Sequence, residues 1–219
     1  MGRRALRRIE AELDLSQHLK KFDDLPRPWN AAALLGRDAP LEIEVGTGKG
    51  LFLSAAAAAQ GETNFFGVEI IAKYARFAAA RLAKQQLSNA VILHGDAMRL
   101  FGELLPNDAL AAVHVYFPDP WWKARHKKRR VMRPAFVKDV ERTLQVGGSL
   151  HFWTDVQEYF DTTLELLAAE TTLCGPLTVG EKPATHDLDY RTHFERRVRM
   201  DGQPIYRAEF RKIGAVRNA

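Results

Sequence analysis

The sequence predicts an α/β fold built on a mainly parallel sheet, with helices on both faces. The main observation is that short β-rich runs alternate with segments of helix-like apolar spacing from residue 41 onward. A second observation is a glycine-rich turn at residues 46–50, directly after the first of these runs. A third is the Asp201-Gly202 pair between two later β-like runs, which predicts an antiparallel hairpin near the C-terminus. Parallel strands connected through helices are the usual outcome of such alternation.

The β-rich runs are expected to form the parallel part of the sheet. They are Leu41–Val45, Asn64–Glu69, Ala90–His94, Ala111–Phe117 and Ser149–Trp153. The segments with helical spacing between them are Lys49–Gln60, Ile71–Leu87 and Arg133–Leu144. Alanines at 55–59 favour the first helix, because alanine has the highest helix propensity and its small side chain allows close packing on a sheet. The later runs, Phe194–Met200 and Pro204–Lys212, are expected to complete the sheet as an antiparallel hairpin.

Length and composition fit one domain with a hydrophobic core. The chain has 219 residues, of which 46% are hydrophobic. We expect a single domain over residues 39–219, preceded by a basic extension over residues 1–38.

No apolar stretch approaches the roughly 20 residues of a membrane span, and the arginines at positions 3, 4, 7 and 8 are not followed by the apolar segment of a secretory signal. We therefore expect a cytoplasmic protein without membrane contact. The single cysteine, Cys174, excludes an internal disulfide, and the scattered histidines argue against a metal site.

The turn after the first predicted strand has the composition of a nucleotide-binding turn. It reads Glu44-Val45-Gly46-Thr47-Gly48-Lys49-Gly50 and lies where a ligand meets the carboxyl end of a parallel sheet. Gly46 and Gly48 let the main chain approach a ligand closely, because no side chain stands between the two. Glu44 would repel a pyrophosphate but would attract the cationic amino-acid end of S-adenosylmethionine. Glu42 lies on the same face of the strand and is a second candidate, although Glu44 is nearer the turn.

Two further acids follow the next two predicted strands. Glu69 ends the second strand, where a carboxylate can accept hydrogen bonds from both ribose hydroxyls of a nucleoside. Asp96 follows the third strand and is suited to the exocyclic amine of an adenine. Each acid alone is also explained as a strand-end residue or, for Asp96, as a helix N-cap. Their occurrence at the ends of three successive strands favours a binding site for an adenosine-containing donor.

A basic segment follows the fourth predicted strand. Residues 121–133 contain seven Lys and Arg and no acid, although the net charge of the whole chain is only +5. Directly before this segment, Pro118 and Pro120 frame a single carboxylate, Asp119. A concentrated cationic surface beside aromatic side chains favours a nucleic acid as the partner. Trp121 or Trp122 is a candidate for stacking on a base, and equally for packing against the protein.

Together these motifs resemble the tRNA (guanine-N7-)-methyltransferase family. The resemblance extends from about residue 40 to residue 212, and Pro118-Asp119-Pro120-Trp121 with its basic continuation is its most specific part. It implies a Rossmann-like class I methyltransferase fold, S-adenosylmethionine as cofactor, and a variable-loop guanosine of tRNA (position 46 by tRNA convention) as methyl acceptor. The implied donor contacts, besides the glycine turn, are Glu44, Glu69, Asp96 and Asp119, of which Asp119 is the catalytic residue. The implied substrate contacts are Lys123, Asp155, Thr192, His193, Phe194 and Glu195. The chain departs from the family pattern at Trp122, where we would expect a proline or a polar residue.

The chemistry of guanine N7 sets what the site must do. In duplex RNA this atom lies in the deep, narrow major groove, so the target base must be in an irregular or opened region. Cationic side chains would then hold backbone phosphates, and the candidates are Arg125, Lys127, Lys128, Arg129 and Arg130. Guanine N7 carries a lone pair and no proton, so the transfer needs no general base. Asp119 is therefore expected to orient the guanine and to stabilise the charge that develops on its ring.

Other functions are compatible with parts of the sequence. A methyltransferase acting on another RNA, a protein or a small molecule would share the glycine turn, although one without an RNA substrate has no use for the basic segment. A nicotinamide-dependent dehydrogenase is disfavoured, because the glycine spacing is wrong. A non-catalytic RNA-binding module is disfavoured by the four acids at the strand ends. The family resemblance implies an enzyme that needs no obligatory protein partner and acts as a monomer or homodimer on tRNA.

Overall fold

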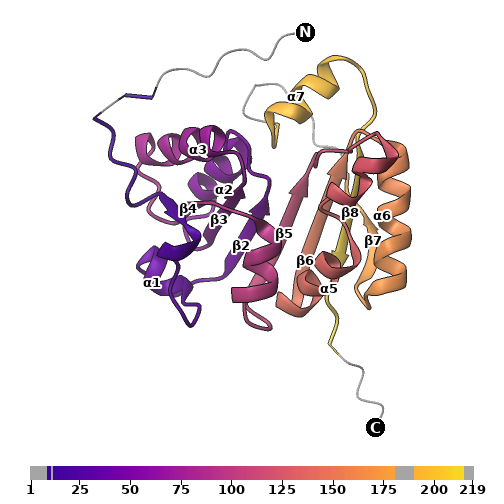
Figure 1. The fold of residues 1–219 in the computed structure, drawn as a ribbon, viewed down its shortest axis with the longest axis horizontal. Coiled ribbons are helices and arrows are strands. Elements are labelled where there is room, and N and C mark those ends of the chain that lie inside the picture. Colours follow the sequence, from indigo (N-terminus) through magenta and orange to yellow (C-terminus); the bar gives the residue numbers. More distant parts are fainter. Residues whose placement is uncertain (1–8, 11, 181–189, 215–219) are drawn as a thin grey trace.

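A central sheet organises the molecule. The structure, a computed structural model, describes residues 9, 10, 12–180 and 190–214, so the arginines at positions 3, 4, 7 and 8 lie outside the described residues. Within the described part of the chain, the sheet has eight strands in the order β1-β4-β3-β2-β5-β6-β8-β7 (Figure 1). All neighbouring pairs from β1 to β6 are parallel, whereas β8 is antiparallel to both β6 and β7.

The elements follow the alternation expected from the sequence. The strands are β1 (Leu19–Lys21), β2 (Leu41–Val45), β3 (Asn64–Glu69), β4 (Ala90–His94), β5 (Leu110–Tyr116), β6 (Leu144–Thr154), β7 (Cys174–Thr178) and β8 (Tyr206–Arg211). The helices are α1 (Ala31–Leu35), α2 (Leu51–Ala59), α3 (Ala72–Lys84), α4 (Ala97–Arg99), α5 (Pro134–Thr143), α6 (Gln157–Glu170) and α7 (His193–Met200). Short turns of helix are η1 (Phe22–Asp24), η2 (Leu100–Leu104) and η3 (Ala124–Arg129). The predicted α/β fold with a mainly parallel sheet and an antiparallel C-terminal end is confirmed, and β2, β3 and β4 have the predicted boundaries.

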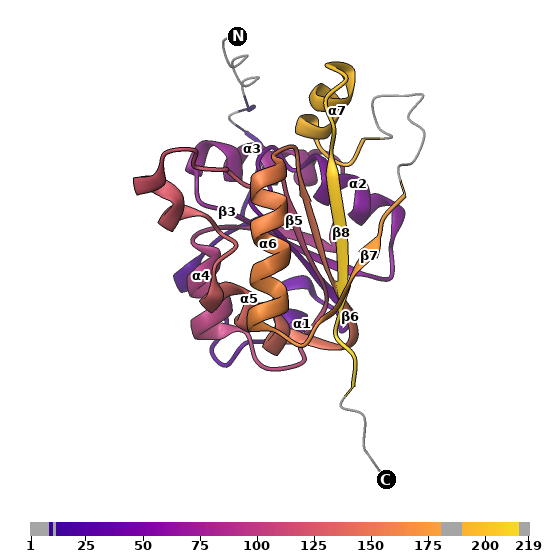
Figure 2. The same ribbon diagram turned by 90° about the vertical axis from the view of Figure 1, so that its right-hand side faces the viewer.

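Helices cover both faces of the sheet. On one face, α2 and α3 pack Leu53 and Leu82 against Phe65 and Ile92 of β3 and β4. On the other face, a larger cluster joins α4, α5 and α6 to the central strands, and its members include Phe136 on α5. Figure 2 shows α4, α5 and α6 on one side of the sheet and α2 on the other. Within the described residues, no helix combines the length and the apolar character that crossing a bilayer requires.

The predicted strand at residues 194–200 is wrong, because this segment forms helix α7. The Thr192 hydroxyl caps the helix by accepting a hydrogen bond from the Glu195 N–H at 2.9 Å. The two buried side chains of α7, Glu195 and Val198, are three residues apart, which is a helical spacing. Gly202 has a φ of +65°, and its N–H donates to the Arg199 carbonyl, so the Asp201-Gly202 pair ends a helix instead of closing a hairpin. The outer antiparallel strand is β7.

The segment before residue 39 contributes to the sheet and to the core. Strand β1 pairs in parallel with β4, and Leu19 lies opposite Ile92. Phe22, Leu25 and Leu35 are buried in the larger hydrophobic cluster. The sequence did not indicate β1, because three residues are too few for a periodic pattern, and the helix α6 was also missed.

Candidate active site

The turn after β2 presents an open main-chain surface at the carboxyl edge of the sheet. Gly46 and Gly48 have φ values of +79° and +54°, which side chains other than glycine adopt only with strain. The N–H groups of Gly46 and Thr47 donate to the Val68 carbonyl at 2.8 and 3.1 Å, which fixes the turn against β3. A Cβ at Gly46 would project into open space, so the missing side chain leaves room for a ligand to approach the main chain.

Glu44 is a buried carboxyl at this turn. Its side chain accepts a hydrogen bond from the Thr47 hydroxyl, and the residue is only 3% exposed. Burial raises the pKa of Glu44 to about 8, and the negative charge of Glu69 adds to the rise, although the Thr47 hydrogen bond opposes it. No cation among the described residues forms an ion pair with Glu44. A buried carboxyl beside an open turn therefore fits a ligand that brings its own positive charge.

Glu42, the competing candidate, has a different partner. Its carboxylate lies 2.8 Å from Nε2 of His114, which is itself buried on β5. The other ring nitrogen of His114 lies 2.9 Å from the Tyr116 hydroxyl. This engagement inside the sheet favours Glu44 over Glu42 as the acid that meets a donor.

Two further acids lie at the same edge. Glu69 accepts hydrogen bonds from the N–H groups of Gly48 at 2.9 Å and Ile71 at 2.8 Å, so it connects the ends of β2 and β3. Burial raises the pKa of Glu69 and the charge of Asp119 adds to it, while these two hydrogen bonds oppose the rise. Asp96 caps α4 by accepting from the Met98 N–H at 2.8 Å through Oδ1. The structure thus brings Glu44, Glu69 and Asp119 into one electrostatic neighbourhood.

An exposed apolar pair follows Glu69 and was not anticipated from the sequence. Ile70 is 68% exposed and Ile71 is 41% exposed, although both are large aliphatic residues. Such exposure beside a cluster of acids is typical of a surface that contacts the flat, apolar face of a ligand ring.

The loop carrying Asp119 is fixed on both sides. At its start, the Phe117 N–H donates to the Trp153 carbonyl at 2.8 Å, and the Phe117 ring packs on Phe194 with centroids 5.1 Å apart. At its end, the Pro120 carbonyl accepts a hydrogen bond from Nε of Arg130 at 2.8 Å. Phe117 and Trp121 have φ values of +50° and +47°, an uncommon conformation for bulky residues, on either side of the exposed Asp119. Such strain persists only where the surroundings hold it, and it clusters at functional sites.

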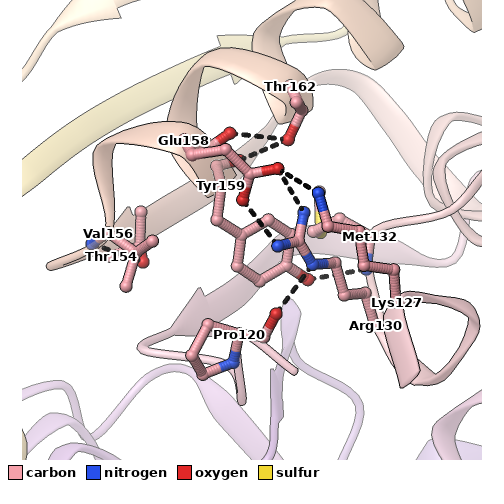
Figure 3. Close-up of polar contacts among 9 residues, drawn as sticks. All are labelled: Pro120, Lys127, Arg130, Met132, Thr154, Val156, Glu158, Tyr159 and Thr162. Atoms are coloured by element: carbon pink, nitrogen blue, oxygen red, sulfur yellow. Dashed lines mark hydrogen bonds and ion pairs between the residues drawn. The ribbon is translucent and has the colours of Figure 1, made fainter. Parts of the chain in front are cut away.

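Arg130 is the anchor of this loop and is not an exposed cation (Figure 3). It is only 8% exposed, and its guanidinium lies over the Tyr159 ring at 4.4 Å. Its Nη2 donates to Glu158 at 2.6 Å, and Lys127 donates to the same carboxylate at 2.7 Å. These two cations lower the pKa of Glu158 to about 2, with the Arg130 bond as the larger cause. This placement does not favour Arg130 as a phosphate contact.

The remaining cations form an exposed surface, called here the cationic turn, over residues 123–129. Its exposed basic side chains are Lys123, Arg125, Lys127, Lys128 and Arg129. Figure 2 shows the segment around residue 125 projecting from the body on the side away from β7. Lys127 pairs with Glu158, whereas the other four cations form no ion pair with a described residue, so their charge is available to a polyanion.

Helix α7 lies above the carboxyl ends of β5 and β6 (Figure 1) and carries the predicted 192–195 motif. Thr192 is its cap, and the Phe194 ring contacts Phe117, two residues before Asp119. His193 lies 3.3 Å from the Arg81 guanidinium on α3. Glu195 is 3% exposed and accepts from the Arg191 N–H at 2.6 Å, with Arg199 and Arg207 each 3.6 Å away. Asp155, half-buried after β6, is at the same edge of the sheet.

Arg191 joins α7 to the sheet and was not singled out from the sequence. Its guanidinium lies 5.0 Å from the centre of the Trp153 ring and donates to the Tyr116 hydroxyl at 3.1 Å. No sequence pattern distinguishes Arg191 from its neighbouring arginines, because its contacts come from β5 and β6. The motif at 192–195 is therefore held against the loop of Asp119 by tertiary contacts.

Comparison with known proteins identifies the family. Residues 38–208 match the family model described as "Putative methyltransferase". A tRNA (guanine-N(7)-)-methyltransferase of Rhodopirellula baltica is 51% identical over 218 residues, which cover 97% of this chain and 80% of that protein. The chain belongs to the tRNA (guanine-N(7)-)-methyltransferase family. The Aeromonas hydrophila protein of this family is 32% identical over 192 residues, covering 88% of this chain and 81% of the relative.

A solved structure shares the fold. The 30S ribosomal A1408 methyltransferase from an uncultured bacterium superposes with a TM-score of 0.53 at 15% identity, covering 83% of this chain and 92% of that one. The predicted class I methyltransferase fold is thereby confirmed. The family membership likewise confirms the predicted enzyme class, with S-adenosylmethionine as cofactor.

Proposed function

We propose that this enzyme transfers a methyl group from S-adenosylmethionine to N7 of a guanosine in the variable loop of tRNA, position 46 by tRNA convention. The observation that carries the proposal is the juxtaposition of Asp119 with Glu44 and Glu69 at one edge, directly before the cationic turn. The similarity to tRNA (guanine-N(7)-)-methyltransferases supports the substrate class.

The donor would lie over the glycine turn. We assign its ammonium group to Glu44, its ribose hydroxyls to Glu69 and its adenine amine to Asp96, because these carboxyls occur in that order along the edge β2-β3-β4. Gly46 and Gly48 allow the main chain to contact the donor, and the exposed Ile70 side chain would pack against the adenine ring. When bound, S-adenosylmethionine supplies an electrophilic methyl group.

Asp119 is the proposed catalytic residue. Guanine N7 attacks through its own lone pair, so no proton has to be removed before the methyl transfer. The Asp119 carboxylate would accept hydrogen bonds from the guanine N–H groups and stabilise the positive charge that develops on the ring. Because the loop is anchored through Phe117 and Pro120, the carboxylate is held in place before the base arrives, and such preorganisation lowers the barrier.

The tRNA would contact the cationic turn and the start of α7. Lys123, Arg125, Lys128 and Arg129 would bind backbone phosphates, joined by Lys127 in spite of its bond to Glu158. The other proposed substrate contacts lie above the sheet edge, and they are Asp155, Thr192, His193, Phe194 and Glu195. Because Thr192 and Glu195 already hold α7, we propose that they act mainly by presenting His193 to the RNA.

The test is to map the product. Purified protein is incubated with S-adenosylmethionine and tRNA that lacks N7-methylguanosine, and modified bases are then located by borohydride and aniline cleavage. We expect scission at one variable-loop guanosine with the wild-type protein and none with Asp119→Ala. Near-normal turnover by Asp119→Ala would overturn the assignment of the catalytic residue, and scission only at another position would overturn the proposed acceptor.

A further inference from the structure

Trp122 is a large aromatic side chain that the fold leaves open to solvent. It is 69% exposed, the largest exposed fraction among the large hydrophobic residues of the described chain. Within these residues no aromatic or cationic group packs on its ring. An indole offers a wide apolar face, so this exposure has a cost in water unless a partner covers it.

Its neighbour Trp121 is packed instead. The Trp121 ring meets His126 edge-on, with centroids 5.8 Å apart, and the Arg129 guanidinium lies 5.0 Å from the ring centre. The left-handed φ of +47° at Trp121 turns the chain between the two indoles. The sequence left open which tryptophan stacks on a base, and the structure separates them, because Trp121 holds the cationic turn together while Trp122 faces outward.

The position of Trp122 is set by the anchored loop. Two residues earlier, the Pro120 carbonyl is bound by Arg130, which is fixed in turn by Glu158 (Figure 3). Trp122 therefore lies on a supported loop, three residues from the proposed catalytic carboxylate of Asp119. A planar group held on a fixed loop loses little further conformational freedom when it binds.

The charges around Trp122 indicate what kind of partner covers it. The cationic turn begins at the next residue, Lys123, and Arg125 and Lys128 are exposed in the same turn. A protein surface or an apolar ligand would have to desolvate these cations, whereas RNA supplies phosphates for them and bases for the indole. Aromatic stacking between cations is the usual arrangement of single-strand nucleic-acid contacts.

We propose that Trp122 is a stacking platform for an unpaired base of the tRNA that neighbours the target guanosine. The proposal rests on the proposed tRNA substrate and adds a specific contact to it. Stacking would hold the opened variable loop so that the guanosine itself can reach Asp119. Trp122 is thus a positioning residue for the substrate and takes no part in the methyl transfer.

Binding affinity is the first test. The dissociation constant for unmodified tRNA is measured in the presence of S-adenosylhomocysteine for wild type, Trp122→Ala, Trp122→Phe and the control Val146→Ala. Val146 is also a large exposed residue, at 64%. It lies near the N-terminal end of β6, whereas the proposed site is at the carboxyl ends of the strands. We expect Trp122→Ala to bind about 5- to 150-fold more weakly, the range for loss of one base stack, while Trp122→Phe retains most of the affinity. Binding by Trp122→Ala within twofold of wild type would overturn the proposal.

Salt dependence separates stacking from charge. Trp122→Ala is expected to shift the plot of log affinity against log salt without changing its slope, because no phosphate contact is lost. Lys128→Ala is expected to lower the slope by about 0.7 to 0.9. A slope reduced in Trp122→Ala as much as in Lys128→Ala would show that the substitution disrupts the cationic turn, against the proposal.

Two further readouts address other partners and the enzyme reaction. Tryptophan fluorescence should be quenched by tRNA in the wild type and much less in Trp122→Phe. If Trp122→Ala changes a dimer into a monomer in sedimentation while tRNA affinity stays unchanged, a second copy of the chain covers the indole and the proposal fails. The mapping of N7-methylguanosine in the wild type tests the proposed function separately, because a protein that binds tRNA through Trp122 but yields no cleavage product refutes only the proposed reaction.

Discussion

Binding of the methyl donor should release a proton from Glu44. The carboxyl is buried, it has no cationic partner among the described residues, and its pKa is raised to about 8. At pH 7 a group with this pKa is about nine-tenths protonated. The donor ammonium favours the carboxylate, so Glu44 must ionise as the donor binds. We therefore expect about 0.9 proton to be released per donor bound at pH 7.

The same pKa sets how strongly donor affinity depends on pH. Ionising Glu44 at pH 7, one unit below its pKa of about 8, costs about 1.4 kcal/mol, which is about a tenfold loss of affinity. Donor affinity should therefore rise by about ninefold between pH 6 and pH 7, below the range in which the amino group of the donor itself loses most of its proton. Glu44→Gln, which cannot ionise, should lose the charge-assisted contact, worth about 1.5–3 kcal/mol, and bind with a pH-independent affinity.

Isothermal titration calorimetry measures the released proton directly. The donor is titrated at pH 7 in two buffers of different ionisation enthalpy, such as phosphate and Tris, and the difference in apparent enthalpy gives the proton count. The control is Glu62→Gln, an exposed carboxyl outside the site. A wild-type count near zero, or an equal count in Glu44→Gln, would refute the reasoning.

The stability of the free protein provides an independent check with a definite sign. The folded pKa of Glu44, about 8, lies above the usual value of 4.5, so its contribution to stability is complete below pH 4.5 and is lost as the pH rises toward 8. Glu44→Gln stays uncharged and should be more stable than the wild type above pH 8, by at most about 5 kcal/mol. Urea midpoints at pH 5 and pH 9 measure this: the advantage of Glu44→Gln should be several kcal/mol larger at pH 9 than at pH 5, and an equal difference at both would contradict the raised pKa.

Further predictions concern the supports of the site. Arg130→Lys removes the hydrogen bond that anchors the loop, so the single-turnover methylation rate should fall by about 10- to 100-fold while donor affinity stays within twofold; an unchanged rate would contradict the anchoring role. Gly50→Ala places a Cβ 2.8 Å from the Cβ of Ala78, at a φ of +69°, and should lower the free energy of unfolding in urea by about 2–3 kcal/mol. The control Gly61→Ala meets no atom within 4 Å and should change the free energy of unfolding by less than about 0.5 kcal/mol. Thr192→Ala removes the cap of α7 and should cost about 1 kcal/mol, seen as faster amide exchange in the first turn of α7, with recovery in Thr192→Ser; equal exchange in all three proteins would rule out the cap as a support.

The sequence by itself determined the layout of the site. Strands β2, β3 and β4 were predicted with their observed boundaries, because buried strands appear as short β-rich runs bounded by turn residues. The glycine turn was also predictable from local sequence, because Gly46 and Gly48 adopt a backbone conformation that other residues adopt only with strain. Parallel strands end at one edge, so the acids that follow them were expected to meet there without any knowledge of side-chain contacts.

Only the tertiary structure decided which of several similar neighbouring residues is buried as a support and which is exposed to a ligand. Arg130 and Lys128 belong to one basic run, but only Arg130 is buried. Its guanidinium donates to Glu158 and lies over the ring of Tyr159, and both residues are on α6, nearly 30 residues later. The two tryptophans at 121 and 122 are adjacent and identical in the sequence, but only Trp121 packs on the cationic turn, whereas Trp122 is exposed. Sequence patterns report local periodicity and backbone preference, whereas burial and partner choice depend on segments that meet only when the chain is folded. The helix α7 illustrates the same limit, because its arginine-rich sequence fits a solvated strand until its cap and its buried Glu195 are placed.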